Sequence, residues 1–300
     1  MAITPPTFLD VVRRLDEFWR RRGALNVFPW DLPKGAATFS PYTFFWALDE
    51  APHQTAYLEP CRRPGDARYG DSPNRLGRYY QYQVFLKPAP KTVRRLYEES
   101  LGILGFKAQE HELRYIEDDW ESPTLGASGV GWEVWLDGLE ITQFTYFQSF
   151  AGFELPLIPV EITYGLERIA MYLQNAASVF DIVWDHGVRY GDIFHKQMEK
   201  EFSKYHFERF DAAHGFGLFD HYNHQAKLLA EEGLILPAYE SVMRCSEIFN
   251  NLDARGAITA EERNRLIGRT RAAAKAVAAA YLKGFEKPEN KPQAQAAPQT

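Results

Sequence analysis

The chain has 300 residues, of which 45% are hydrophobic and 15% aromatic, so it can bury a large core in one or two domains. Its formal net charge is −6 and its isoelectric point about 5.8, which disfavours a protein that holds nucleic acid with its whole surface. Two distant cysteines, Cys61 and Cys245, exclude a disulfide framework and a cysteine-rich zinc site, so no zinc is expected. With no apolar span and no recognisable secretion signal, we expect a cytoplasmic protein with no membrane partner.

The first predicted element is a helix that Thr7 opens, with Asp10 placed for a capping interaction. Hydrophobic residues recur along it at helical spacing, and Gly23 ends it. A short strand is expected over 24–28, followed over 31–41 by a loop rich in Gly, Pro and Thr.

A long antiparallel hairpin is predicted next, with strands over 54–63 and 79–86 and a polar, glycine-containing loop between them. Five arginines gather around its tip: Arg62, Arg63, Arg68, Arg75 and Arg78. The planar fork of an arginine matches phosphate, and rigid strands would aim these side chains toward one place. We therefore favour a polyphosphate clamp over a solvated surface loop.

Two glutamines, Gln81 and Gln83, share one face of the second hairpin strand. Polar side chains on a central strand need partners, so these two line a cavity or lie at a sheet edge as ordinary satisfied residues.

A helix over 92–104 and strands over 112–118, 131–136 and 140–147 continue the pattern. The segment 161–168 then predicts a strand that passes through a glycine into a helix. Further helices are expected over 193–210, 217–232, 236–252 and 259–285, and a disordered tail over 287–300. The fold class is therefore α+β, an antiparallel sheet flanked by helices and followed by an all-α domain.

Two segments could carry chemistry. Arg168, in the first turn of a helix and beside Gly165, is a suitable seat for a planar base and its phosphates, although a solvated ion pair with Glu167 is the alternative. Glu140 and Gln143 offer the oxygen ligands that Mg²⁺ prefers. Strand alternation places these two on opposite faces unless the strand bulges.

Taken together, these pieces resemble the three signature motifs of class II aminoacyl-tRNA synthetases. The similarity is closest to the alpha subunits of the bacterial heterotetrameric glycyl-tRNA synthetases, and it covers about 7–285. The segments that carry it are 62–64, 71–76, 79–83, 132–135, 142–148, 161–168 and 251–258. One departure from the class is Pro64, which follows Arg62-Arg63 where an Arg-x-Glu pattern is usual, so the residue that reads the adenine edge stays unassigned.

The resemblance implies a six-stranded antiparallel catalytic sheet with the first motif at an alpha–alpha dimer interface. It implies a class II catalytic domain over 1–190 and a helical domain over 191–286. It also implies glycine, ATP with Mg²⁺, and tRNA-Gly as substrates, and a separate beta subunit in an alpha2beta2 enzyme. The helical domain would contact that subunit, the acceptor end of the tRNA, or both.

By the same resemblance, Arg62 would hold the α-phosphate and the attacking carboxylate, and Arg168 would stack on adenine and reach the γ-phosphate. Glu140, with Gln143, would bind Mg²⁺, and Arg62, Arg168 and Glu140 form the expected catalytic set. With the hairpin cluster, the residues expected to bind ATP are Arg62, Arg63, Arg75, Glu140, Gln143 and Arg168.

The bulk of the side chains before Gly165 favours glycine, because a pocket selects the smallest amino acid by excluding larger ones. Glu161 would attract the substrate ammonium, although a strand-edge salt bridge is its alternative role. The expected glycine-binding residues are Gln81, Gln83, Trp120, Glu161 and Thr163. A paralogue of the same fold that is non-catalytic, or that adenylates without charging tRNA, is the alternative function.

Overall fold

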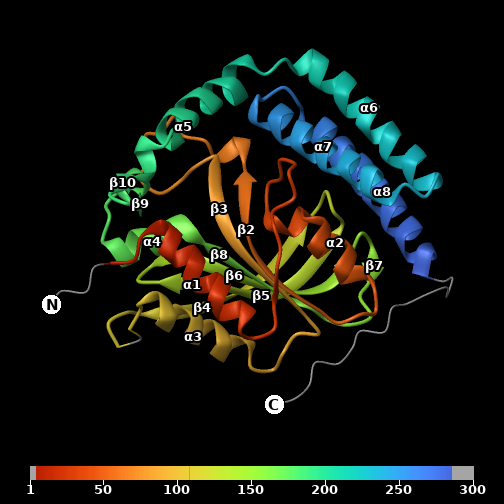
Figure 1. The fold of residues 1–300 in the computed structure, drawn as a ribbon. Helices are drawn as coiled ribbons and strands as arrows, with labels where there is room; N and C mark the ends of the chain where they lie inside the picture. The colour runs from red at the N-terminus through yellow and green to blue at the C-terminus, as the bar shows by residue number, and fades with distance from the viewer. Residues whose placement is uncertain (1–4, 108, 286–300) are drawn as a thin grey trace.

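A mixed sheet of eight strands organises the part of the chain that the computed structural model describes, residues 5–107 and 109–285 (Figure 1). Its strand order is β1-β2-β3-β8-β6-β5-β4, with β7 paired to β6. The strands are β1 (Leu25–Asn26), β2 (His53–Arg62), β3 (Arg78–Lys87), β4 (Leu113–Ser122), β5 (Ala127–Leu136), β6 (Leu139–Phe150), β7 (Phe153–Glu154) and β8 (Val160–Gly165). The α+β class is confirmed, and the expected tail over 287–300 lies outside the described residues.

The six long strands form an antiparallel array, as expected, but two short strands extend it. β1 pairs with β2 in parallel and covers only part of the predicted strand over 24–28, and β7 folds back on β6. The predicted hairpin is confirmed, because β2 and β3 pair along their full length, from His53 opposite Lys87 to Arg62 opposite Arg78. β4 and β5 are longer than their sequence patterns predict.

Helices α1 (Phe8–Arg20), α3 (Val93–Leu104) and α4 (Leu166–Gln174) pack their apolar residues against one face of this sheet. Thr7 caps α1 as predicted, because its hydroxyl accepts from the Asp10 N–H and the Asp10 carboxylate accepts from the Thr7 N–H. The buried partners on the sheet include Val84 and Ile162. This side of the sheet carries the larger of the apolar clusters in the described chain.

The opposite face is covered by helices from both ends of the chain (Figure 1). Helix α2 (Pro41–Leu48), which the sequence pattern does not predict, stacks Phe44 on Tyr239 with ring centroids 4.2 Å apart. Helices α5 (His195–Lys204), α6 (Ala212–Glu231), α7 (Ile235–Ala254) and α8 (Ala260–Phe285) form an arc over the sheet, and a π turn over Tyr205–Arg209 follows α5. The predicted helical character after Asp192 is thereby confirmed.

Shorter elements complete the described chain. A small hairpin of β9 (Val183–Asp185) and β10 (Val188–Arg189) precedes α5, and it was not expected from the sequence. Single 3-10 turns cover Ala37–Phe39, Pro64–Asp66, Val179–Asp181 and Tyr190–Asp192. None of the helices in the described ranges combines the length and the apolar character needed to cross a bilayer.

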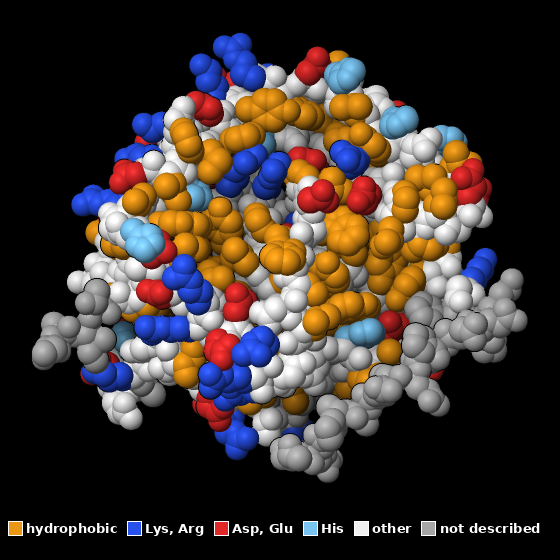
Figure 2. All heavy atoms as spheres, viewed as in Figure 1, with side chains coloured by type: hydrophobic (Ala, Val, Ile, Leu, Met, Phe, Trp, Pro, Cys, Tyr) orange, Lys and Arg blue, Asp and Glu red, His pale blue; other side chains and the backbone are white. Residues whose placement is uncertain are grey.

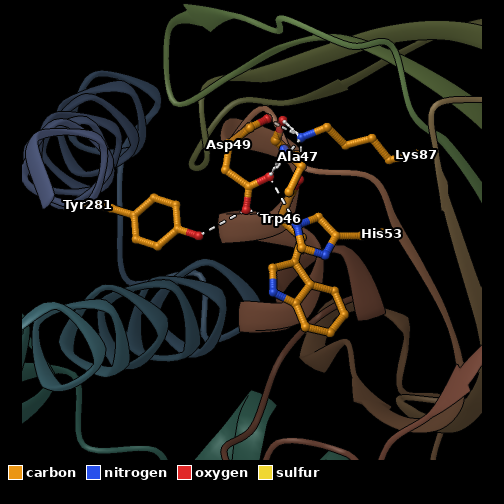
Figure 3. Close-up of polar contacts among 7 residues, drawn as sticks. Trp46, Ala47, Asp49, His53, Lys87 and Tyr281 are labelled. Carbon is orange, nitrogen blue, oxygen red and sulfur yellow. Dashed lines mark hydrogen bonds and ion pairs between the residues drawn. The ribbon is translucent and has the colours of Figure 1, made fainter. Parts of the chain in front are cut away.

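A buried polar network ties the helical arc to the sheet (Figure 3). Lys87, at the end of β3, donates to the carbonyls of Trp46, Ala47 and Asp49 at the end of α2, where the helix dipole favours a positive charge. The Asp49 carboxylate accepts from the hydroxyl of Tyr281 on α8 and contacts His53 Nε2 at 2.9 Å. One fully buried lysine thus joins β3, α2 and α8.

Candidate functional site

A cavity of about 370 Å³ opens where the β2–β3 hairpin, β6, β8 and the start of α4 meet. The sequence-predicted residues that line it are Arg63, Arg75, Gln81, Glu140, Gln143, Thr163 and Arg168. The fold thus brings together side chains that lie about a hundred residues apart in the sequence. Because most of the residues that the sequence analysis expects to bind ATP line this space, we call it the nucleotide cavity.

The two consecutive arginines where β2 ends, Arg62 and Arg63, do not share this cavity. Arg63 lines it, with its Nε donating to the Gly35 carbonyl at 2.8 Å and its guanidinium 5.3 Å from the Tyr79 ring centroid. Arg62 faces a second cavity, where its Nη1 lies 3.8 Å from Glu247 Oε1. Neighbouring residues of an extended chain point to opposite sides, so Arg63 lines the same cavity as Arg168, whereas Arg62, the residue expected there, lines the second cavity.

The arginines at the hairpin tip are likewise divided, which corrects the expectation that they point to one place. Arg75 lines the nucleotide cavity and pairs with Asp66 at 2.7 Å. Arg78 lies with Arg62 in the second cavity, and Arg68 donates to the carbonyls of its own loop.

Arg168 is held at the mouth of the nucleotide cavity by Glu140. Its Nη1 donates to the Glu140 carbonyl at 2.7 Å and to Glu140 Oε2 at 3.2 Å. The neighbouring Glu167 does not form the solvated pair considered above, because it is buried and accepts from the Tyr80 N–H and the Tyr190 hydroxyl. Burial raises the pKa of Glu167 to about 7, against the lowering effect of these donors.

A β-bulge brings Glu140 and Gln143 to the same side of β6. Trp135 pairs with Glu140 and Val134 with Thr142, so Ile141 is an extra residue in the ladder. Both side chains line the nucleotide cavity, and Gln143 Nε2 donates to Asp118 Oδ2 at 2.6 Å, which turns the amide oxygen away from that carboxylate. Burial raises the pKa of Glu140, and the Arg168 charge opposes that rise. This oxygen donor set fits a hard cation such as Mg²⁺.

A buried polar cluster of Gln83, Glu161 and Thr163 adjoins the nucleotide cavity, which Thr163 lines. The Thr163 hydroxyl donates to Gln83 Oε1 at 2.9 Å and lies 3.3 Å from Glu161 Oε1. Gln83 and Glu161 are 0% and 3% exposed, and in the described part of the chain Gln83 Nε2 and Glu161 Oε2 have no hydrogen-bond partner. Buried polar atoms are rarely left unpaired, and the Gln83 amide lies close enough to the Glu161 carboxylate to lower its pKa by hydrogen bonding, so the two side chains form one polar cluster.

Thr38, which the sequence reasoning missed, is a further member of this polar cluster. Its hydroxyl donates to Glu161 Oε1 at 2.7 Å, and the loop that carries it is fixed by the Ala37 N–H donating to Gln81 Oε1 at 3.0 Å. Gln81 therefore positions the loop that carries Thr38. No periodicity or motif in the predicted loop over 31–41 marks Thr38.

Trp120 lies apart from these residues. It lines a wider groove of about 620 Å³, together with Phe39 and Arg63, and packs edge-on against Phe147 with ring centroids 5.3 Å apart. The groove shares Arg63 with the nucleotide cavity, so the two spaces adjoin, but Trp120 is absent from the lining of that cavity.

Comparison with known proteins gives a family and two solved structures. The chain is similar to a pyrrolysyl-tRNA synthetase of Desulfitobacterium hafniense at 15% identity, over 62% of this chain and 75% of that chain, with a TM-score of 0.42. It is similar to a second crystal structure of pyrrolysyl-tRNA synthetase from the same organism at 17% identity, over 62% and 77% of the two chains, with a TM-score of 0.41. A family model described as glycyl-tRNA synthetase alpha subunit matches residues 8–286. Because that match spans nearly the whole chain, the protein belongs to the glycyl-tRNA synthetase alpha subunit family.

Proposed function

We propose that this alpha subunit of glycyl-tRNA synthetase, a class II ATP-dependent ligase, activates glycine in the nucleotide cavity and at the polar cluster beside it. The glycine carboxylate forms a bond to the α-phosphorus of ATP, the bond to the bridging oxygen of the β-phosphate breaks, and pyrophosphate leaves with that electron pair. With a beta subunit, the glycyl group then passes to the 3′ end of tRNA-Gly. The observation that carries the proposal is the meeting of Arg63, Arg168 and Glu140 beside the unpaired atoms of Glu161 and Gln83.

Charge and positioning supply the catalysis, because the glycine carboxylate is already ionised at neutral pH and needs no protein base. Arg63 would hold the α-phosphate and the attacking carboxylate and so stabilise the charge that develops between them. Arg168 would stack on adenine and reach the γ-phosphate, and Arg75 would add a further phosphate contact. Nucleotide binding would draw Arg168 from its contact with Glu140.

Mg²⁺ would be held by Glu140 and Gln143, which share the cavity through the bulge. The ion prefers few protein ligands beside substrate phosphates and water, so a two-residue site suffices. When bound, it would neutralise charge on the ATP phosphates.

The polar cluster around Glu161 suits a glycine zwitterion. The unpaired carboxylate oxygen of Glu161 would accept from the ammonium, and the unpaired Gln83 amide would donate to the carboxylate oxygen of the substrate. Thr38 and Thr163 contact Glu161 from two sides, so a Cβ substituent on the substrate would meet packed side chains. The site would therefore select glycine by steric exclusion.

The partner assignments extend this proposal. Phe28 and Leu25, next to the sheet edge at β1, are 90% and 58% exposed, which supports an alpha dimer through this region. The basic residues of α8 are partly engaged within the chain, since Arg263 pairs with Asp253 and Arg269 with Asp220. This engagement favours contact of the helical region with the beta subunit over a continuous track for tRNA phosphates. The cytoplasmic location stays a prediction.

Glycine-dependent ATP–pyrophosphate exchange by the alpha–beta complex tests the proposal. We expect exchange with glycine and none above background with alanine or serine, and charging when tRNA-Gly is added. Exchange driven by a different amino acid would overturn the glycine assignment. Exchange without charging would identify an adenylate-forming relative with another acceptor.

A further inference from the structure

A second cavity, of about 220 Å³, lies on the other side of the β2–β3 hairpin, between its tip and the helical arc. Arg62 and Arg78 line it from the hairpin, and His206, Glu247 and Asn251 line it from the π turn and α7. Figure 2 shows Lys and Arg side chains gathered with acidic ones in the hollow beneath the arc of C-terminal helices. Arg62 is the one residue of the sequence-expected ATP and glycine sets that lines this cavity, and it is absent from the lining of the nucleotide cavity.

The two guanidinium groups in this cavity lack a close anion. Arg62 and Arg78 are directly opposite each other in the β2–β3 ladder, yet the nearest carboxylate contact of Arg62 is Glu247 at 3.8 Å. Among the residues that the structure describes, Arg78 has no carboxylate within ion-pair distance, and its Nε is buried without a hydrogen-bond partner. Its guanidinium instead lies 3.4 Å from the centroid of the Phe202 ring.

This arrangement is electrostatically strained. Burial lowers the pKa of Arg78 to about 10, and the Arg62 charge lowers it further, although Glu199 and Glu247 oppose the shift. Lys34 also lines this cavity, but its ammonium already donates to Glu59 Oε1 at 2.8 Å and to the Trp30 carbonyl. It therefore adds no unpaired charge. The two adjacent guanidinium groups thus have one ion-pair contact between them, Arg62 with Glu247 at 3.8 Å, and an anionic ligand would stabilise the pair.

The opposite wall is suited to recognition of a small oxyanion. His206 Nδ1 contacts Asn251 Oδ1 at 2.6 Å, which fixes both side chains at the cavity. His206 belongs to the π turn, an element that is rare and frequent at functional sites. The volume is below the ~300–1,000 Å³ of pockets for drug-sized ligands, and so suits one phosphate group better than a whole nucleotide.

We propose that this cavity is a phosphate-binding site in which Arg62 and Arg78 grip a single phosphate group. The two consecutive arginines, the last residue of β2 and the one after it, then bind separate anions, with Arg63 serving the nucleotide and Arg62 the second phosphate. The phosphate comes either from the backbone of the tRNA or from free inorganic phosphate, and the tRNA source rests on the proposed function. Arginine suits both because its fork binds phosphate oxygens bidentately.

The test uses the alpha–beta complex with Arg78→Gln and Arg62→Gln, the charge-keeping Arg78→Lys and Arg62→Lys, and Arg95→Gln as a surface control. Glycine-dependent exchange should stay within twofold of wild type in all of them, since neither Arg62 nor Arg78 lines the nucleotide cavity. Inorganic phosphate, titrated at constant ionic strength, should raise the Tm of wild type and of Arg168→Gln, but not that of Arg78→Gln or Arg62→Gln. The lysine variants should keep part of the shift.

Measurements with tRNA distinguish a tRNA phosphate from free inorganic phosphate. If the phosphate belongs to tRNA, both glutamine variants raise the KM for tRNA about tenfold. In a plot of log KM for tRNA against log salt concentration, the slope falls by about one. An unchanged KM with a lost phosphate effect identifies free phosphate as the ligand. If Arg78→Gln fails to fold, the result with Arg62→Gln is used, because the Arg62 side chain is 41% exposed and its replacement should not disturb folding. If the glutamine variants keep both the phosphate effect and the tRNA affinity of wild type, the proposed site is wrong. If wild type itself shows no exchange, the proposed function is wrong instead.

Discussion

At the scale of single residues, the chemistry of this site depends on which side chains a strand turns toward the cavity. The sequence predicts the arginine-rich hairpin, and the structure contains it. The sequence could not predict which of Arg62 and Arg63 lines the nucleotide cavity, since this follows from the pairing of β2 with β3 and of β3 with β8. Thr38 was beyond prediction because only the fold brings its loop to Glu161.

Replacing Glu161 by Gln should weaken glycine binding selectively. The change removes the charge that faces the ammonium while keeping the shape, so we expect a loss of about 2 kcal/mol, or roughly 30-fold in the KM for glycine. The KM for ATP should change less than twofold. Exchange kinetics at varied glycine and ATP measure both, with the exposed Glu112→Gln as control, and an equal rise in both KM values would contradict the assignment.

The pH dependence of glycine use follows from the same carboxyl group. Burial raises the pKa of Glu161 to about 7, and the hydrogen bond from Thr38 opposes that rise. Only the ionised form attracts an ammonium, so affinity is full above this pKa and is lost as the pH falls through it. We expect the KM for glycine to rise by up to tenfold per pH unit below about 7, and the Glu161→Gln variant to show no such slope. A wild-type profile that is flat from pH 5.5 to 8 would rule this role out.

At the scale of elements, irregularities in regular structure make the site. The bulge at Ile141 turns Glu140 and Gln143 to one side, which a shared Mg²⁺ site requires and which the sequence alone does not predict. Gly165 lies beside this bulge. A Cβ at position 165 would lie only 3.2 Å from the Ile141 carbonyl oxygen, so a larger residue would crowd the bulge. Helix α2 escaped prediction because it is buried on most sides, which removes the polar face that periodicity detects.

Glu140→Gln should change the metal requirement of the reaction. The carboxylate is the only charged member of the proposed ligand pair, so its loss weakens Mg²⁺ binding with its phosphate partners. We expect a roughly tenfold higher Mg²⁺ concentration for half-maximal exchange. Glu133→Gln, a change on the neighbouring strand, serves as the control. An unchanged Mg²⁺ titration in Glu140→Gln would remove this residue from the metal site.

At the scale of the whole molecule, the helical arc and the sheet share buried contacts. Helices α7 and α8 pack with α2 against the far face of the sheet, and Tyr281 reaches the Asp49–Lys87 network (Figure 3). The sequence predicts the order of these elements, whereas the contacts between them arise from residues far apart in the chain. The domain boundary at 190/191 stays a prediction.

Lys87→Met should destabilise the whole fold. The change leaves Asp49 and three carbonyls without their buried cation, which costs about 3 kcal/mol or more in the free energy of unfolding. Tyr281→Phe removes one hydroxyl from the same network and should cost about 1 kcal/mol. Denaturant unfolding measures both, with the exposed Lys91→Met as control. A loss for Lys87→Met no larger than that of the control would show that the network does not stabilise the fold.

The central claim is that Arg63, and not its neighbour Arg62, meets the reacting phosphate opposite Arg168. The direct measurement is glycine-dependent ATP–pyrophosphate exchange by Arg63→Gln and Arg62→Gln complexes prepared side by side. We expect the Arg63 variant to lose about 100-fold in kcat/KM, in keeping with the removal of one transition-state donor, and the Arg62 variant to stay within about twofold of wild type. The reverse order of losses would contradict the account.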